Sequence, residues 1–112
     1  MTPVTSAMAL KALDCLTERA AVTSENIANA NTPGYRPLKV SFEASLQAAA
    51  SQGVDAVNAV QPKIERDTDP AEASGVRLDL QMATTSMTSA RFAALIQILS
   101  LKMQQTRTAL GT

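Results

Sequence analysis

Mostly apolar residues recur at alternating spacings of four and three near the start of the chain. They are Ala9, Leu13, Leu16, Ala20, Thr23, Ile27 and Ala30. This is the a/d pattern of a coiled-coil helix, and it places these side chains on one stripe. Thr2 is suited to cap the helix and Pro3 to be its first residue. Because Pro33 disfavours helical backbone in the residue before it, we expect the helix to end at about Asn31.

The same spacing continues without a break over the last part of the chain. Its positions are Leu78, Met82, Thr85, Ser89, Phe92, Ile96, Leu99, Met103, Thr106 and Leu110. The pattern predicts a helix of about 32 residues, about 48 Å long, with Asp79 as its N-cap and Gly111 after its end. The first half of this stripe is small and polar. We therefore expect apolar contact to concentrate in the second half, from Phe92 to Met103.

The middle of the chain has a weaker pattern. Leu38, Phe42, Leu46 and Ala49 are four, four and three residues apart, which predicts a short amphipathic helix over about 42–50 with Ser41 as its cap. Between 51 and 75, glycine, proline and aspartate interrupt the periodicity. We expect an irregular, partly extended connector there, with a brief strand at 63–66 and a single helical turn at 69–72. This connector is either a surface loop without a role or a contact surface that becomes ordered on assembly.

Together these elements predict an all-α fold that forms one structural unit. Residues 1–37 supply the N-terminal helix and a Pro-Gly-Tyr turn, residues 38–77 the short helix and irregular connector, and residues 78–112 the long C-terminal helix. The two terminal helices are expected to pair as a coiled-coil-like hairpin. We expect the main assembly seam of the C-terminal helix to face a matching seam of the N-terminal helix. The first set is Phe92, Ile96, Leu99 and Met103, and the second is Leu13, Leu16, Ala20 and Ile27.

Composition changes this picture by limiting the core that the chain can build alone. The chain has 112 residues, enough for one domain, and only 3% of them are aromatic. Chains of this size bury a smaller share of their surface than larger domains do, so a large private core is not expected. Such helices gain more from packing against neighbours, which favours a component of an assembly.

Charge and residue chemistry exclude several classes of function. Ten basic residues balance ten acidic ones, so neither a nucleic-acid footprint nor a polybasic membrane surface is indicated. Charges interrupt the first apolar stretch early, at Lys11 and Asp14, so we expect no cleavable signal peptide, and the polar content argues against a direct membrane span. Cys15 is the only cysteine and the chain has no histidine. We therefore expect no disulfide, no metal or cofactor site, and no enzyme.

The stretch between the first helix and the middle of the chain contains a predicted turn. Pro33 presets φ at the second turn position and Gly34 supplies the positive φ that a type II turn needs at the third, with Thr32 and Tyr35 as flanks. Asn29 and Asn31 are suited to cap carbonyls at the helix end. On local chemistry alone, this is a helix C-terminus followed by a loop.

The residues around this turn resemble the N-terminal signature of the bacterial flagellar axial proteins, which are rod, hook and hook-associated subunits. The resemblance is carried by Asn26, Ile27, Ala28, Asn29, Thr32, Pro33, Gly34 and Tyr35. The short length leaves no room for outer domains. The chain therefore resembles the rod proteins of the flagellar basal body, and among them most closely the B type of the proximal rod, with the C type as the near rival.

This resemblance implies a structural subunit that assembles helically and transmits torque from motor to hook. It implies export by the flagellar type III apparatus, a place in the periplasmic rod, and contact with copies of the chain, with other rod proteins and with the adaptor protein at the export gate. A soluble helical interaction module, such as an export adaptor or chaperone, is the second hypothesis, although it would not need a rigid Pro-Gly-Tyr corner. A wall-cutting enzyme is the third, but the chain lacks an acid/base pair on a folded element.

Overall fold

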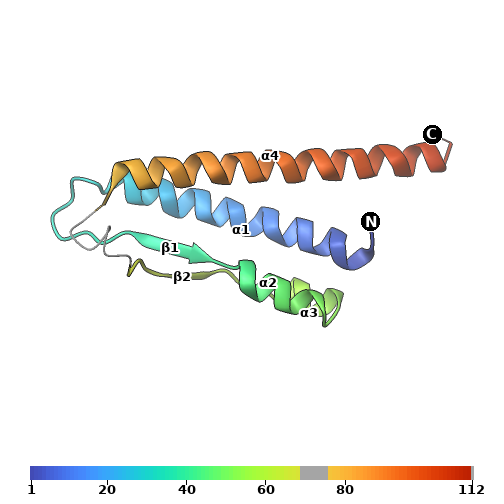
Figure 1. Cartoon of the computed structure of the whole chain (residues 1–112), viewed down its shortest axis with the longest axis horizontal. Helices are drawn as coiled ribbons and strands as arrows, with labels where there is room; N and C mark the ends of the chain where they lie inside the picture. The colour runs from blue at the N-terminus through green and yellow to red at the C-terminus, as the bar shows by residue number, and fades with distance from the viewer. Residues whose placement is uncertain (69–75, 112) are drawn as a thin grey trace.

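The computed structural model describes residues 1–68 and 76–111, and within these it is mostly helical. In chain order the elements are α1 (Pro3–Ala28), β1 (Leu38–Ser41), α2 (Glu43–Ala50), α3 (Val54–Asn58), β2 (Lys63–Arg66) and α4 (Leu78–Ala109). The two long helices lie side by side (Figure 1), as the sequence predicted. The molecule is elongated, with extents of 59 × 28 × 16 Å.

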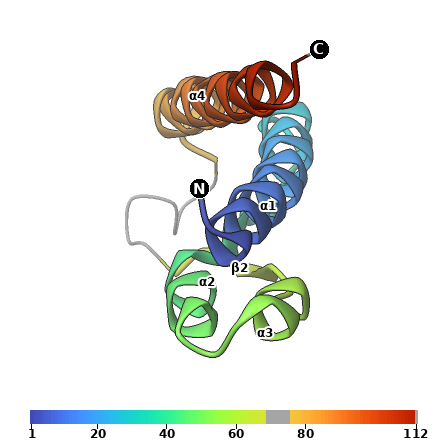
Figure 2. The same ribbon diagram turned by 90° about the vertical axis from the view of Figure 1, so that its right-hand side faces the viewer.

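Helix α1 is the central layer of the molecule. Seen from the end, α4 lies on one side of α1, and α2, α3 and the two strands lie on the other (Figure 2). Helix α1 contacts α2, α3, α4 and β1. Its sequence must therefore supply packing residues for two opposite neighbours.

The ends of α1 follow local capping chemistry. Thr2 is the N-cap and its hydroxyl accepts a hydrogen bond from the Thr5 N–H at 3.1 Å, with Pro3 as the first helical residue, as predicted. The expected end at Asn31 is wrong by three residues, since α1 ends at Ala28 and Asn29 is its C-cap. Beyond Asn29 the backbone hydrogen bonds span three residues instead of four, from the Ala30 N–H to the Ile27 carbonyl and from the Thr32 N–H to the Asn29 carbonyl, so the α-helix does not continue.

The predicted turn is present at residues 32–35. The Tyr35 N–H donates to the Thr32 carbonyl at 3.1 Å, and Gly34 has φ of 75°. These are the hydrogen bond and the positive φ of a type II turn. The chain reverses there and enters β1.

The described part of the middle segment, residues 38–68, has more regular secondary structure than expected. Strand β2 lies where a brief strand was predicted, and it pairs antiparallel with β1 in the register Leu38↔Arg66 to Ser41↔Lys63. Neither β1 nor α3 was predicted. Leu38 belongs to β1, where it is half-buried, Val40 is buried and Lys39 is exposed, so the local period is two and not that of a helix.

Two of the N-caps predicted from the sequence, Ser41 and Asp79, are wrong. Ser41 does not cap α2, because it is the last residue of β1, and the N-cap is Phe42 without a side-chain bond. Asp79 does not cap α4, whose N-cap is Arg77; the Asp79 carboxylate lies in the first turn and binds the Arg77 guanidinium at 2.7 Å. The helical turn expected at 69–72 lies outside the described residues. The length of α4, 32 residues, agrees with the prediction.

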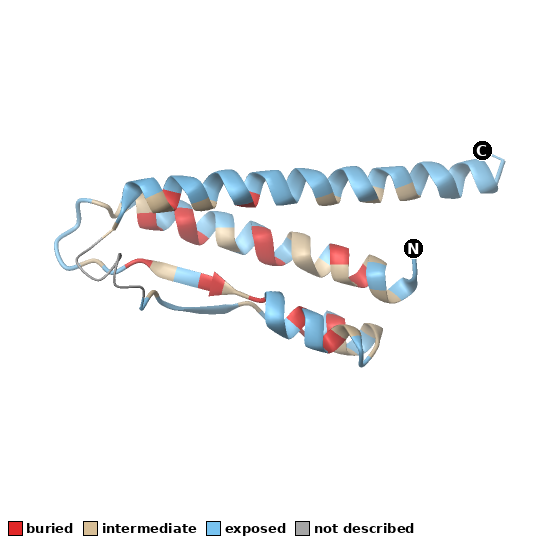
Figure 3. Ribbon diagram, in the orientation of Figure 1, coloured by how far each residue is buried: buried red, intermediate tan, exposed pale blue. Residues whose placement is uncertain are grey.

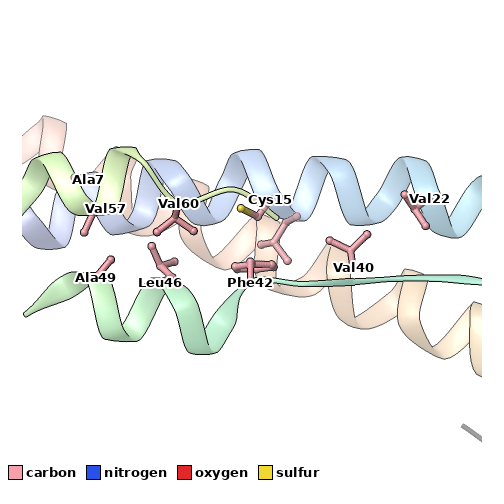
Figure 4. Close-up of a cluster of buried hydrophobic side chains, with 10 residues drawn as sticks. Ala7, Cys15, Val22, Val40, Phe42, Leu46, Ala49, Val57 and Val60 are labelled. Carbon is pink, nitrogen blue, oxygen red and sulfur yellow. The ribbon is translucent and has the colours of Figure 1, made fainter. Parts of the chain in front are cut away.

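The hydrophobic core lies between α1 and the middle segment. Its buried members are Ala7, Cys15, Leu16, Val22, Val40, Phe42, Leu46, Ala49, Val57 and Val60 (Figures 3 and 4). Among the described residues, none of these comes from α4, although Leu95 packs against the cluster. The core therefore joins the first half of the chain to itself, and α4 is held by other contacts.

Helix α4 packs through small and polar side chains. Its buried residues are Gln81 and Thr88, both in its first half. The apolar contact expected from Phe92 to Met103 is represented within the chain by Leu95, which packs against the core, and contact of that half with neighbouring copies stays a prediction. Gln81, Thr88 and Leu95 are seven residues apart, and each lies one position before the expected stripe at 82, 89 and 96. The side of α4 that packs inside the chain is thus rotated relative to the predicted seam, and on this side Gln81 accepts a hydrogen bond from Asn26 of α1.

Candidate functional site: the corner after α1

Asn26 is the buried polar centre of the corner that the sequence singled out. Its side chain is 1% exposed and takes part in four hydrogen bonds. An amide can donate two hydrogen bonds and accept two, so the whole capacity of this side chain is used. A buried amide that is fully paired fixes the position of every group bonded to it.

Two of these bonds join α1 to β1. The Leu38 N–H donates to Asn26 Oδ1 at 2.9 Å, and Asn26 Nδ2 donates to the Leu38 carbonyl at 2.8 Å. The side-chain amide therefore pairs with both backbone groups of one residue, as a neighbouring strand would. This closes the edge of β1 that faces away from β2 and leaves no unpaired backbone at Leu38.

The other two bonds reach the turn and α4. The Tyr35 hydroxyl donates to Asn26 Oδ1 at 2.9 Å, and Asn26 Nδ2 donates to Gln81 Oε1 at 3.0 Å. Gln81 is itself 6% exposed. One side chain thus ties together α1, the type II turn, β1 and the first turns of α4.

The remaining residues of the signature shape the backbone of the corner. The Thr32 hydroxyl donates to Asn29 Oδ1 at 3.1 Å, which links the helix cap to the start of the turn. Pro33 and Gly34 are exposed and serve the turn conformation only. Ile27 is half-buried and Ala28 is exposed. The signature therefore divides into one buried anchor, Asn26, with its partner Tyr35, and a set of turn-forming residues.

The far side of the corner is held by arginines. The Arg66 guanidinium lies 5.7 Å from the centre of the Tyr35 ring and also donates to the Arg36 carbonyl. Arg36 donates to the Asp67 carbonyl at 3.2 Å, and the Asp67 N–H donates to the Pro37 carbonyl at 2.9 Å. These contacts fasten the end of β2 to the segment that follows the turn.

A second polar centre lies two turns earlier on α1, at Arg19. Its guanidinium donates to the Val40 carbonyl at 2.8 Å, pairs with the Glu43 carboxylate at 2.6 Å and lies 4.8 Å from the centre of the Phe42 ring. Arg91 of α4 approaches the same carboxylate at 3.7 Å. Burial raises the pKa of Glu43, but hydrogen bonds from Arg19 and from backbone N–H groups outweigh burial and hold the pKa below its usual range.

Sequence reasoning missed Arg19 and Gln81. Arg19 lies seven residues before Asn26, on the same face of α1, while Val40 lies two residues after Leu38 on β1. A polar residue seven positions from the signature asparagine was thus an available signal. Gln81 had no such signal, because its role depends on how α4 is rotated, and the expected stripe gave a different rotation.

The two sets of residues expected to form the assembly seam are not all buried against each other within the chain. On α4, Phe92, Ile96 and Met103 are 37%, 44% and 62% exposed, and Leu99 is half-buried. On α1, Leu16 is buried, Leu13 and Ile27 are half-buried, and Ala20 is exposed. Within a single chain the α4 seam is therefore largely open. Its contact with neighbouring copies stays a prediction.

The described residues contain no group of three or more histidine, cysteine, aspartate or glutamate side chains that could hold a metal ion. No helix within 1–68 and 76–111 has the length and apolar character needed to cross a bilayer. The corner is held by a side-chain amide paired with a backbone residue, by a guanidinium bound to a carboxylate, and by a turn of fixed conformation.

Comparison with known proteins gives a family match for the segment that contains Asn26 and the turn. Residues 5–36 match a family model described as flagella basal body rod protein. The match covers most of α1 and the turn at residues 32–35, and so includes Arg19, Asn26 and Tyr35. A search among curated proteins found no match to the chain.

Proposed function

We propose that this chain is a subunit of the proximal rod that assembles helically and transmits torque from motor to hook, because residues 5–36 match the family model described as flagella basal body rod protein. The family is one of structural rod components and not a class of enzymes. The resemblance of the chain favours the B type of rod protein as the model for its role, with the C type as the rival.

The observation that supports this proposal is that the side chain of Asn26, inside the matched segment, takes part in four hydrogen bonds. A subunit that transmits torque must keep its elements from sliding past one another under load. Asn26 fixes α1 to β1, to Tyr35 and to Gln81 through buried hydrogen bonds of 2.8 to 3.0 Å. Paired buried groups resist displacement, since breaking them leaves polar atoms unsatisfied.

The open apolar face of α4 supports assembly from many copies. The exposed large apolar residues on one stripe of α4 are Leu78, Met82, Phe92, Ile96, Met103 and Leu110, whereas Met87, Ile98 and Leu101 are exposed on its other side. An apolar surface of this extent on a small chain is typical of a face that is covered in an assembly. Contacts between different faces of successive subunits build an open filament whenever the rotation between them does not close a ring.

The expected partners are other copies, the other rod proteins and the adaptor protein at the export gate. We propose that the chain reaches the periplasmic rod through the flagellar type III apparatus without a cleavable signal. These features follow from the family resemblance.

The test is to delete the gene in the source bacterium and to restore it with a tagged copy. We expect the deletion to abolish motility and to give basal bodies without a complete rod in electron micrographs. The tagged chain should cofractionate with purified basal bodies. A deletion strain with intact rods, or a tagged chain that stays a compact monomer outside the basal body, would instead favour a soluble interaction module.

A further inference from the structure

A shallow hollow lies at the corner and is open to the surface. It has a volume of about 370 Å³ and is lined by Thr32, Pro33, Gly34, Tyr35, Arg36 and Arg66. The turn supplies most of its wall, and its charged lining residues are the two arginines, which are both exposed. This site, the basic hollow, therefore combines the apolar surface of a rigid turn with two positive charges.

The two guanidinium groups of the basic hollow are held in place without being neutralised. Arg66 donates to the Arg36 carbonyl, and its guanidinium lies 5.7 Å from the centre of the Tyr35 ring. Arg36 donates to the Asp67 carbonyl at 3.2 Å. In the part of the chain that the structure describes, neither guanidinium forms an ion pair with a carboxylate. A guanidinium has five N–H donors in a fork that fits a carboxylate, so both arginines keep donors for an acidic ligand.

Helix α1 carries the matching charge on a side that no other element covers. Asp14, Glu18 and Glu25 are four and seven residues apart, so they lie on one stripe of the helix, the acidic strip. All three are exposed, whereas α4 and the layer of α2 and α3 cover other sides of α1 (Figure 2). Within residues 1–68 and 76–111 none of the three forms an ion pair, and Lys11, one turn before Asp14, forms none either. The exposed Ala21 between Glu18 and Glu25 lets a partner approach closely.

The basic hollow and the acidic strip of one molecule are too far apart to bind each other. Glu18 lies ten residues before Ala28, the last residue of α1, which is about 15 Å along the helix axis. The corner lies beyond that end of α1, at one end of the molecule (Figure 1). The opposite charges of the two surfaces are thus not used inside the chain.

We propose that the basic hollow of one copy binds the acidic strip of a second copy, with Arg36 and Arg66 bound to the carboxylates of Asp14 and Glu18. These two carboxylates are one helical turn apart, so each can meet one of two neighbouring guanidinium groups. The contact joins two different surfaces and displaces the second copy along the long axis, so it is heterologous and can repeat. This inference deepens the proposed function and rests on it, because it assigns the corner a role in contact between copies.

Charge reversal on each surface, followed by mixing, tests the contact directly. Arg36→Glu alters the basic hollow and Glu18→Arg alters the acidic strip; both positions are exposed. Sedimentation of the purified full-length chains measures self-association. Each variant alone should have an apparent Kd about tenfold or more above that of the wild type, because like charges then face each other. An equal mixture should associate with a Kd within about threefold of the wild-type value, since the unaltered hollow of one variant meets the unaltered strip of the other.

Two control variants change the charge by the same amount outside both surfaces. Lys39→Glu lies on β1 and Asp55→Arg lies on α3, and both positions are exposed. Neither control should change the apparent Kd by more than about threefold, and their mixture should behave as each does alone. Higher ionic strength should weaken association of the wild type, since opposite charges at the surface are screened. Circular dichroism of each variant checks that its helix content is unchanged.

Three results overturn the proposal: a wild-type chain that stays monomeric at every concentration, a mixture of Arg36→Glu and Glu18→Arg that associates no better than either alone, or equal effects from the control variants. Purified protein is used here, whereas the proposed function is tested by cofractionation in cells. A chain found in basal bodies whose two charge-reversed variants do not restore each other refutes the contact between hollow and strip and leaves the rod assignment standing.

Discussion

At the scale of single residues, the corner depends on an asparagine whose side-chain amide pairs with strand β1 as the backbone of a neighbouring strand would. Asn26 donates to and accepts from the same backbone residue, Leu38, and uses its two remaining bonds on Tyr35 and Gln81. Aspartate could keep the two accepted bonds but could not donate to Leu38 or Gln81. The requirement at this position is therefore for an amide, and size or polarity alone does not meet it.

Asn26→Leu should lower the free energy of unfolding by about 3 to 5 kcal/mol, because it leaves several buried partners without a hydrogen bond at about 1 to 3 kcal/mol each. Urea melts followed by circular dichroism measure this change. Asn29→Ala is the matched control: its bonds are exposed, so it should cost about 1 kcal/mol or less. Equal losses from the two variants would show that Asn26 is only a helix-end residue.

The ion pair at Glu43 should make stability depend on pH. Burial raises the pKa of this carboxyl, but the hydrogen bonds from Arg19 and from backbone N–H groups lower the pKa by more than burial raises it. The pKa in the folded state is therefore below that in the unfolded state. Its contribution is then fully present above the unfolded pKa of about 4.3 and is lost as the pH falls through the folded pKa. The difference in urea midpoint between wild type and Glu43→Gln should shrink as the pH falls from about 7 to about 3. A difference that stays constant would contradict this.

At the scale of elements, the sequence predicted the two long helices and also α2 and β2, and it missed β1 and α3. The length of α4 follows from heptad spacing, and the start of α1 follows from the capping residue Thr2 and from Pro3. Strand β1 was missed because Leu38, Phe42 and Leu46 also fit a helical stripe. Its strand conformation depends on pairing with β2 and on the Asn26 amide, both distant in sequence. The rotation of α4 was missed for the same reason, since it is set by contacts of Gln81 and Thr88 with α1.

The turn element gives a prediction about the backbone alone. Gly34 has φ of 75° and a Cβ there would meet nothing within 4 Å, so any penalty comes from conformation and not from a clash. Gly34→Val should cost about 1 to 3 kcal/mol, because a β-branched residue is strained at positive φ. Gly34→Asn should cost less, since asparagine tolerates this region. Thermal melts compare the two.

In cells, Gly34→Val should impair rod assembly more than secretion, because the conformation of the turn matters for contacts between packed subunits and not for export. Counting basal bodies with complete rods and measuring the exported chain separate these effects. Normal motility in a strain that carries Gly34→Val together with Pro33→Ala would show that the corner is an ordinary loop.

At the scale of the whole molecule, packing is unevenly distributed between the two sides of α1. The core lies between α1 and the middle segment, and α4 is held by Gln81, Thr88 and Leu95 and by the Arg91–Glu43 contact. The second half of α4 thus keeps large apolar residues at its surface. A chain whose longest helix is covered on one face only has a free energy of folding that depends on its neighbours.

Ile96→Asp should stop rod assembly while leaving the chain folded and exported. Ile96 is 44% exposed in the single chain, so a charge there costs little until a neighbouring copy covers it, when burial of an unpaired carboxylate becomes strongly unfavourable. Gln97→Asp, which is also exposed and lies one residue off the predicted seam, should be tolerated far better. Circular dichroism of the purified variants and motility of the complemented strains measure the two parts of this prediction. Equal defects from Ile96→Asp and Gln97→Asp would show that the apolar seam of α4 does not form the interface, because only a seam facing a partner distinguishes adjacent positions on one helix.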